Sequence, residues 1–326
     1  MYALGIESTA HTFGVGIVDE RCEVLANVKA SYTNPDAGIH PRLAADHHLT
    51  NGPRVLRDAL EKAGLGMKDI EVVSFSQGPG LGPCLRVGGI TARYLSSKYG
   101  KPILGVNHCV AHVEIGKVKT KARDPVVVYT SGANTQIITY ECRKYRVLGE
   151  TLDMGVGNVL DQFGRDMGMG FPAGPVIDGR YFKGKNLIPL PYSVKGMDLV
   201  FAGLLTAATQ KIGNADEDDL CYSLMHTAFS MITEVAERAL AHSEKNELLV
   251  TGGVAASKAL SEMLTHMCRD RGAALHVVPI PYAMDNGAMI AWQGMIEHRA
   301  GRTQSIPETG VNQRYRTDQV DVFWND

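Results

Sequence analysis

A pattern of three short apolar runs occurs twice along the chain, and it constrains the fold more than any other feature. Short apolar runs with turn residues between them predict consecutive antiparallel strands. The first copy spans Tyr2–Ile6, Phe13–Val18 and Glu23–Ala30, and the second spans Val126–Thr130, Thr135–Tyr140 and Tyr145–Thr151. In both copies a small polar turn follows the first strand. We therefore predict a structural duplication of two α/β halves.

Strands that alternate with helices follow each copy, which is typical of parallel sheets covered by helices. In the first half we predict helices over 41–63, 84–99 and from 108 onward, and strands over 72–77 and 103–106. In the second half we predict helices over 158–167, 202–212 and 216–242, near 255 and after 285, and strands over 248–251 and 275–278. The N-terminal α/β lobe is expected at 1–124 and the C-terminal α/β lobe at 125–326, with a helical insert at about 155–245.

Composition and charge argue against several classes of protein. The chain has 326 residues, with 33 Lys and Arg against 35 Asp and Glu, which gives a net charge of −2. A broad basic surface for nucleic acid is therefore disfavoured. The six cysteines form no Cys-x-x-Cys pair, which argues against a zinc ribbon or a dithiol redox centre and fits a reducing cytoplasm. No secretory signal and no membrane span are indicated, so we expect a cytoplasmic protein.

Two histidines at helical spacing are the strongest candidates for a metal site. His108 and His112 stand four residues apart directly after the strand over 103–106, which places both imidazoles on one helix face. Asp285 opens the last helix, and Tyr129 ends a strand of the second half. Two imidazoles with oxygen ligands suit Fe²⁺ or Zn²⁺ with one position open for substrate. The spacing also fits two histidines at a solvated or capped helix start, and the residues alone leave both interpretations open.

Three loops with small residues follow predicted strands, at the sheet edge where ligands bind in α/β folds. The first contains Glu7, Ser8, Thr9 and His11, and it is a candidate anion-binding loop because converging backbone N–H groups bind anions. The second loop covers 131–135 and the third covers 251–255. An ordinary tight turn is the alternative for each loop, and none has the Gly-x-x-x-x-Gly-Lys pattern of a P-loop.

Two further stretches receive structural interpretations only. His47 and His48 lie in a polar helical stretch and are expected to be solvated. The acidic residues 216–219 are expected to begin a helix, where carboxylates suit the helix dipole.

Five stretches of the sequence resemble the universal tRNA threonylcarbamoyladenosine family. They are Gly5–Thr12, Phe75–Pro83, Val106–Glu114, Gly149–Asp153 and Met284–Ala291. The pattern is similar to the archaeal and eukaryotic catalytic subunit of the KEOPS assembly, and the bacterial branch is more distant. The resemblance implies the fold of the actin, hexokinase and Hsp70 superfamily (ASKHA), with two duplicated α/β lobes around a central nucleotide cleft.

The resemblance also implies an activity. A threonylcarbamoyl group would pass from threonylcarbamoyl-adenylate to N6 of the adenosine 3′ of the anticodon, in tRNAs that read ANN codons, and AMP would leave. The implied cofactors are one divalent metal, Fe²⁺ or Zn²⁺, and a bound ATP, AMP or threonylcarbamoyl-adenylate, which Mg²⁺ can accompany. The implied partners are tRNA, a kinase-like ATPase subunit, a small dimer-forming subunit and a tRNA-binding subunit, with no membrane.

The site residues of the family carry over to matching positions of this sequence. The implied metal ligands are His108, His112, Tyr129 and Asp285. The implied nucleotide or adenylate contacts are Tyr129, Thr130, Ser131, Gly132, Ala133, Asp161, Gly174 and Asp178, with Gly252, Gly253 and Ser257 nearby. No side chain stands out as a general acid or base.

Several positions depart from the family's usual pattern. Ala133 and Ala173 stand where relatives usually have Gly, and the extra methyl group can crowd a ligand. Asp178 replaces the usual Glu, and Ser257–Lys258 stands where an Asn pair is usual. These changes imply an altered ligand affinity or a diverged paralogue.

Two alternative functions are weighed against the transferase. A metalloprotease would use the His108 and His112 pair, but the sequence has no His-Glu-x-x-His arrangement to supply a Glu base. A nucleotide-regulated binding module, or a sugar-kinase relative without catalysis, would share the fold. The His pair and Asp285 count against that module, because a sugar kinase uses a catalytic Asp with magnesium.

Overall fold

The computed structural model describes residues 1–34 and 38–325, which form two compact units. The first unit comprises Met1–Val118, Cys142–Tyr145 and Met284–Asp326, and the second comprises Lys119–Glu141 and Arg146–Ala283. The predicted lobes, 1–124 and 125–326, divide the chain at a single point of the sequence. In the structure, the last segment, from Met284 onward, packs with the first unit although it lies in the predicted C-terminal lobe.

The first unit is built on a five-stranded mixed sheet with the order β3-β2-β1-β4-β5. β1 pairs antiparallel with β2, β2 pairs antiparallel with β3, and β4 lies parallel to both β1 and β5. The strands are β1 (Tyr2–Glu7), β2 (Thr12–Asp19), β3 (Val24–Ser31), β4 (Val72–Gly78) and β5 (Ile103–Asn107). The helices are α1 (Pro41–Ala63), α2 (Gly82–Tyr99), α3 (His108–Thr120) and α10 (Gly287–Arg299), with 3-10 turns η2 (Ile306–Thr309) and η3 (Thr317–Gln319).

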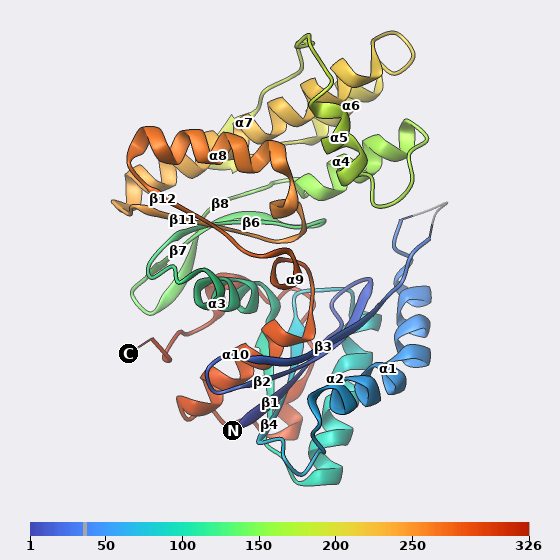
Figure 1. The fold of residues 1–326 in the computed structure, drawn as a ribbon, viewed down its shortest axis with the longest axis vertical. Coiled ribbons are helices and arrows are strands. Elements are labelled where there is room, and N and C mark those ends of the chain that lie inside the picture. Colours follow the sequence, from blue (N-terminus) through green and yellow to red (C-terminus); the bar gives the residue numbers. More distant parts are fainter. Residues whose placement is uncertain (35–37, 326) are drawn as a thin grey trace. The chain divides into compact units, whose positions relative to one another are not determined.

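Alternating side chains give this sheet two different faces, because successive residues of a strand point to opposite sides. Leu4, Phe13 and Phe75 belong to the apolar core that includes residues of α1 and α2. On the other face the strands carry Gly5 and Gly16, and α10 packs there. Figure 1 shows α1 and α2 on one side of the strands and α10 on the other.

Glycines allow α10 to lie directly on the backbone of β1 and β2. A Cβ atom at Gly5 would fall 2.0 Å from the backbone nitrogen of Ala291, and one at Gly16 would fall 2.1 Å from that of Ala288. A Cβ at Gly287 would in turn meet the backbone nitrogen of Gly16 at 2.1 Å. No side chain fits at these three positions. The contact therefore fixes the start of α10, just after Asp285.

The second unit is built on another five-stranded sheet, with the order β12-β11-β6-β7-β8. Its strands are β6 (Val126–Thr130), β7 (Thr135–Glu141), β8 (Lys144–Glu150), β11 (Glu247–Thr251) and β12 (Ala274–Val277). A two-stranded sheet pairs β9 (Val194–Lys195) with β10 (Asp198–Leu199). The remaining elements are α4 (Val156–Asp166), α5 (Gly174–Tyr181), α6 (Ala202–Thr209), α7 (Glu217–Ser243), η1 (Gly253–Ala256), α8 (Lys258–Arg271) and α9 (Ile280–Ala283).

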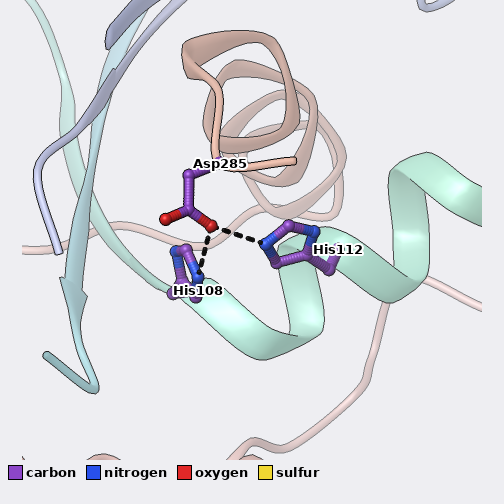
Figure 2. Close-up of side chains that lie close together, drawn as sticks. All are labelled: His108, His112 and Asp285. Atoms are coloured by element: carbon purple, nitrogen blue, oxygen red, sulfur yellow. Dashed lines mark hydrogen bonds and ion pairs between the residues drawn. The ribbon is translucent and has the colours of Figure 1, made fainter. Parts of the chain in front are cut away.

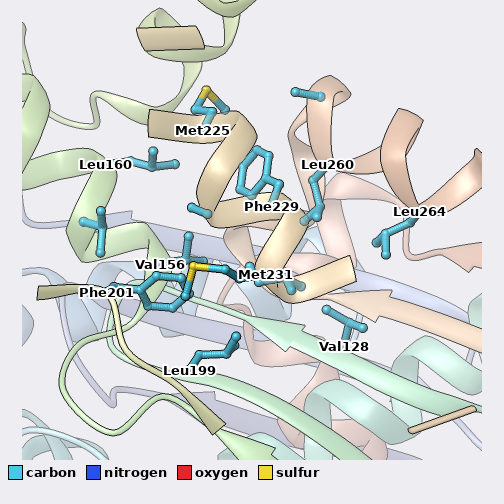
Figure 3. Packing of buried hydrophobic residues seen from close by; sticks show 14 of the residues in the cluster. Val128, Val156, Leu160, Leu199, Phe201, Met225, Phe229, Met231, Leu260 and Leu264 are labelled. Carbon is cyan, nitrogen blue, oxygen red and sulfur yellow. The ribbon is translucent and has the colours of Figure 1, made fainter. Parts of the chain in front are cut away.

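A single apolar cluster forms the core of the second unit. Phe201, Phe229 and Leu260 are fully or almost fully buried in it, and they come from the α6 N-terminus, α7 and α8. Figure 3 shows these side chains packed with Val128 of the sheet. α7 begins at Asp216, whose carboxylate accepts hydrogen bonds from the backbone N–H groups of residues 218 and 219 at 3.0 Å. This confirms the predicted helix start.

The two sheets have the same strand order, which confirms the predicted duplication. β6, β7 and β8 correspond to β1, β2 and β3, and β11 and β12 correspond to β4 and β5. The strand directions match as well. β6 pairs antiparallel with β7, as β1 does with β2, and β11 lies parallel to both β6 and β12, as β4 does to β1 and β5. The fold is the duplicated α/β fold of the actin, hexokinase and Hsp70 class.

The sequence predicted most elements and missed two short helices and the two-stranded sheet. The helix over 41–63 and the strand over 126–130 are confirmed at both ends. β9, β10 and α9 have only two, two and four residues, which is too few to show a periodic pattern, and α5 begins with Gly174 and Pro175, which are typical of turns. The expected solvation of His48 is wrong, since this side chain is fully buried against the loop after β1. Within the described residues, no helix combines the length and apolarity needed to cross a membrane.

The glycine contact under α10 generates a stability prediction. Gly16→Ala should lower the free energy of unfolding by about 3 kcal/mol, because the new methyl group meets backbone atoms that cannot move aside. Gly203→Ala is the matched control, since Gly203 is exposed on α6 with nothing within 4 Å. That control should be neutral or stabilising by about 0.5 kcal/mol. Urea unfolding of the purified variants measures both changes, and equal midpoints for the two would contradict the close packing.

Candidate metal centre and nucleotide-binding loops

The predicted histidine helix, α3, begins directly at the end of β5. The Asn107 side chain caps it, because its Oδ1 accepts hydrogen bonds from the backbone N–H groups of Cys109 and Val110 at 2.9 and 3.1 Å. Every residue from His108 to Gly116 is buried. The helix start is thus capped, and both imidazoles are held away from solvent. Of the alternative interpretation, a solvated or capped helix start, the capped form is present and the solvated form is excluded.

His108, His112 and Asp285 meet at one point in the first unit (Figure 2). The Nε2 atoms of His108 and His112 lie 3.4 and 3.3 Å from Oδ1 of Asp285. One ligand atom from each of the three residues can be chosen so that all lie within 4.8 Å of one another. Two ligands at normal zinc distances in a tetrahedron are roughly 3.4 Å apart, so these spacings suit a shared ion.

Glu7 contacts Nδ1 of His108, the ring nitrogen that does not face Asp285. Its Oε2 lies 2.9 Å from His108 Nδ1, and its Oε1 accepts hydrogen bonds from the backbone N–H and the hydroxyl of Thr9 at 2.6 and 2.5 Å. A carboxylate on the far nitrogen of a ligating histidine fixes the tautomer and aims the other nitrogen at the metal. The Nε2 of His108 accordingly faces Asp285. The sequence interpretation of Glu7 as part of an anion loop missed this contact.

Burial and charge move the pKa values of the three residues in different directions. Burial alone would lower the pKa of His108, but the carboxylates of Glu7 and Asp285 outweigh it and raise this pKa well above its ordinary value. Burial lowers the pKa of His112, which the charge of His108 lowers further. Burial would raise the pKa of Asp285, but its bonds to the two histidines hold that pKa well below the usual range.

These residues fit a divalent metal. Two imidazole nitrogens and one ionised carboxylate are ligands that Fe²⁺ and Zn²⁺ accept, with positions left for further oxygen ligands. A cation bound at Nε2 of His108 would displace any proton at that nitrogen and leave Nδ1 bonded to Glu7. Tyr129 belongs to the second unit, where it is the last residue but one of β6 and its side chain is fully buried. Its role as a ligand stays a prediction.

The loop after β1 is ordered by contacts within the first unit. The N–H of Ser8 donates to Ser76 Oγ at 3.0 Å, and the N–H of Thr9 donates to Glu7. The carbonyl of His11 accepts from the N–H of Tyr32 at 2.8 Å. Binding of an anion by Glu7, Ser8, Thr9 and His11 therefore stays a prediction, and the donors at Ser8 and Thr9 already have partners in the chain.

The predicted nucleotide contacts lie in the second unit, at the carboxyl ends of β6 and β11 and on the helices nearby. Gly252 has a φ of +97°, and a Cβ there would meet the carbonyl oxygen of Thr130 at 2.1 Å. The carbonyl oxygens of Ser131 and Gly132 accept hydrogen bonds from the first turn of α4 at 3.2 and 3.0 Å. Ala133 and Gly253 lie in the same two loops. The carbonyl oxygens of Ser131 and Gly132 are thus bonded within the second unit, and contacts of these loops with a nucleotide stay predictions.

Two of the unusual positions contact each other. The hydroxyl of Ser257 donates to Asp178 Oδ1 at 2.5 Å, and the N–H groups of Lys258 and Ala259 lie 3.3 Å from the same carboxylate. Asp178 thus caps the N-terminus of α8 from α5. Asp161 of α4 similarly accepts from the N–H of Ala173 at 2.9 Å, just before Gly174. Both aspartates tie loops together, and their contacts with a nucleotide stay predictions.

Comparisons with known proteins agree with the motifs. The family model described as "TsaD: tRNA N6-adenosine threonylcarbamoyltransferase" matches residues 23–292. A tRNA N6-adenosine threonylcarbamoyltransferase of Thermococcus gammatolerans is 53% identical over 327 residues, with 100% of both chains covered. A "probable bifunctional tRNA threonylcarbamoyladenosine biosynthesis protein" of Methanocaldococcus jannaschii is 51% identical over 99% of this chain. The match covers only 60% of the length of that relative.

A solved structure supports the fold. HypF of T. kodakarensis superposes with a TM-score of 0.62 at 13% identity, over 91% of this chain and 48% of that one. This likeness concerns the architecture alone, because identity is low. The family model and the full-length relative rest on sequence and extend over most of the chain. The chain therefore belongs to the tRNA N6-adenosine threonylcarbamoyltransferase family.

Proposed function

We propose that this chain transfers the threonylcarbamoyl group from threonylcarbamoyl-adenylate to N6 of the adenosine 3′ of the anticodon, in tRNAs that read ANN codons. In this proposal it acts as the metal-containing catalytic subunit of a KEOPS complex. The observation that carries the proposal is the buried site of His108, His112 and Asp285 in a chain of this family. The geometry gives no support to a protease, because no base of the His-Glu-x-x-His kind accompanies the histidines.

The reaction forms a bond between adenosine N6 and the carbamoyl carbon and breaks the bond from that carbon to the phosphate oxygen. AMP carries away the bonding electrons, and N6 loses a proton. His108, His112 and Asp285 would hold the metal, which when bound supplies Lewis acidity toward the carbamoyl and phosphate oxygens. Glu7 orients His108 through Nδ1. We assign no side chain as general acid or base.

Partner subunits are part of the proposal because the net charge of −2 gives the chain no excess of cations for tRNA phosphates.

An apolar surface supports a partner contact. Leu49 of α1 is 61% exposed, and Ile90 and Tyr94 of α2 are 61% and 58% exposed. The two helices pack against each other. Exposed apolar side chains on two helices that pack together are candidates for a protein contact. We propose that a subunit of the assembly docks on this α1–α2 surface.

Reconstitution tests the reaction. The chain, its kinase-like, dimer-forming and tRNA-binding partners, a threonylcarbamoyl-adenylate synthetase, threonine, bicarbonate, ATP and unmodified tRNA are combined. Nucleoside mass spectrometry should then detect N6-threonylcarbamoyladenosine only when the chain is present. The absence of product, with the partners shown to bind, would contradict the proposed activity.

Metal dependence is tested by His108→Ala combined with His112→Ala. This double variant should lose bound Fe²⁺ or Zn²⁺ and lower the transfer rate by at least about a hundredfold, since two of the donors are removed. His242→Ala is the control, because His242 is exposed on α7. Metal analysis, circular dichroism and the transfer assay give the three readouts. A folded double variant that modifies tRNA at the wild-type rate would contradict the proposed metal mechanism.

The α1–α2 surface is tested by Leu49→Glu combined with Ile90→Glu. Two charges in an apolar contact should weaken association with the partner subunits at least about tenfold while the isolated chain stays folded. Leu187→Glu provides the control, because Leu187 is 55% exposed in the second unit. Size-exclusion chromatography of the mixed subunits measures assembly. Unchanged assembly of the double variant would exclude this surface as the docking site.

A further inference from the structure

The C-terminal segment contacts the metal-bearing helix at its start and at its middle. We call residues 312–324 the C-terminal strap. At the start of α3, the Asn107 side-chain amide donates to the carbonyl oxygens of Tyr315 and Arg316 at 3.0 and 3.2 Å. The same side chain caps α3 through its Oδ1. The residue that starts the helix just before His108 is therefore held by the strap.

In the middle of α3, the strap bonds to a buried carboxylate. Glu114 is 4% exposed, and its Oε1 accepts hydrogen bonds from Trp324 Nε1 at 2.9 Å and from the Tyr145 hydroxyl. Lys117 pairs with the other oxygen, with Nζ 3.1 Å from Oε2. A carboxylate buried this deeply is costly unless its lone pairs are satisfied. Trp324 thus supplies one of the bonds that keep Glu114 in place.

Glu114 and the metal-site histidines project from different sides of α3. Successive helix residues are rotated by about 100°, so Glu114 lies roughly 200° around the axis from His112. Asp285 and Glu7 contact the histidine side, while Trp324 and Tyr145 contact the Glu114 side. Contacts on two sides fix the rotation of a helix about its own axis. That rotation decides where the imidazoles point.

The strap is itself fixed to the sheet of the first unit. The N–H of Asn312 donates to the carbonyl of Gln77 at 2.8 Å, and the N–H of Val322 donates to the carbonyl of Arg143 at 2.9 Å. A Cβ at Gly78 would fall 1.7 Å from the carbonyl oxygen of Asn312, so β4 and the strap are in direct backbone contact. The strap is therefore tied to the unit at several points along its length.

We propose that the C-terminal strap sets the position of the metal site, and that Glu114 and Trp324 are positioning residues for it. Neither side chain touches the histidines, so both act through α3. The inference rests on the proposed metal-dependent function. It predicts that small changes at the strap weaken metal binding without changing any donor.

Titration with Co²⁺ tests the inference, with Co²⁺ as a spectroscopic stand-in for Fe²⁺ or Zn²⁺. Trp324→Phe keeps an aromatic ring and removes the Nε1 donor, and it should weaken Co²⁺ binding about tenfold and change the visible d–d bands. Tyr145→Phe removes only a hydroxyl and should act in the same direction. Glu114→Ala should weaken binding as much or more. Glu114→Gln should weaken binding less than Glu114→Ala, because its amide oxygen can accept the bonds at Oε1 while the ion pair of Lys117 with Oε2 is lost.

Trp292→Phe is the matched control. The chain has two tryptophans, and the buried Nε1 of Trp292 has no hydrogen-bond partner among the described residues. This variant loses the same atoms without losing a bond, so its Co²⁺ affinity should match wild type. Unfolding curves separate a loss of metal affinity from a loss of folding. Tyr145→Phe keeps the test decisive if Glu114→Ala does not fold.

Three outcomes are distinguishable. Weaker Co²⁺ binding in Trp324→Phe and Tyr145→Phe, with Trp292→Phe unchanged, supports the inference. Wild-type Co²⁺ affinity in Trp324→Phe, the variant within the strap, overturns it and leaves the metal site intact. A wild-type chain whose Co²⁺ binding does not depend on His108 and His112 overturns the metal part of the proposed function, and the inference with it.

Discussion

The first unit depends on the close contact between α10 and the backbones of β1 and β2. Gly5, Gly16 and Gly287 leave no room for a side chain there, so the helix and the sheet meet backbone to backbone. This contact also positions residues of the metal site, because Asp285 lies two residues before α10 begins and Glu7 ends β1. The two carboxylates on either side of His108 are thus placed by one rigid contact between a strand and a helix that are almost three hundred residues apart in the chain.

Charge links the residues of the site. Two carboxylates share one imidazole, which raises the pKa of His108, while burial lowers the pKa of His112. A divalent cation at this point would meet the carboxylate of Asp285, whose pKa the two histidines hold well below the usual range, and its binding would displace any proton on the two Nε2 atoms. The capped start of α3 and its burial fix the geometry before any ligand arrives.

The sequence predicted the repeated architecture because both halves repeat short apolar runs at strand spacing. It also singled out His108, His112 and Asp285, because i,i+4 spacing and a helix start are local features. It missed the contacts of Glu7, Glu114 and Trp324, whose partners are distant in the chain and become visible only in the folded unit. His48 was wrongly expected in solvent, since a polar helical stretch does not reveal a histidine that packs on a loop. Its buried ring bonds to the carbonyl of Ala10, and burial lowers its pKa to about 4.

The cap of α8 has a mechanical consequence for the second unit. Asp178 comes from α5, and its carboxylate accepts from the Ser257 hydroxyl and from the N–H groups of Lys258 and Ala259. A displacement of α5 would therefore remove the hydrogen-bond partner of three donors at the start of α8 at once. Because the loop after β11 leads directly into that start, the position of α5 is coupled to the loop that contains Gly252 and Gly253.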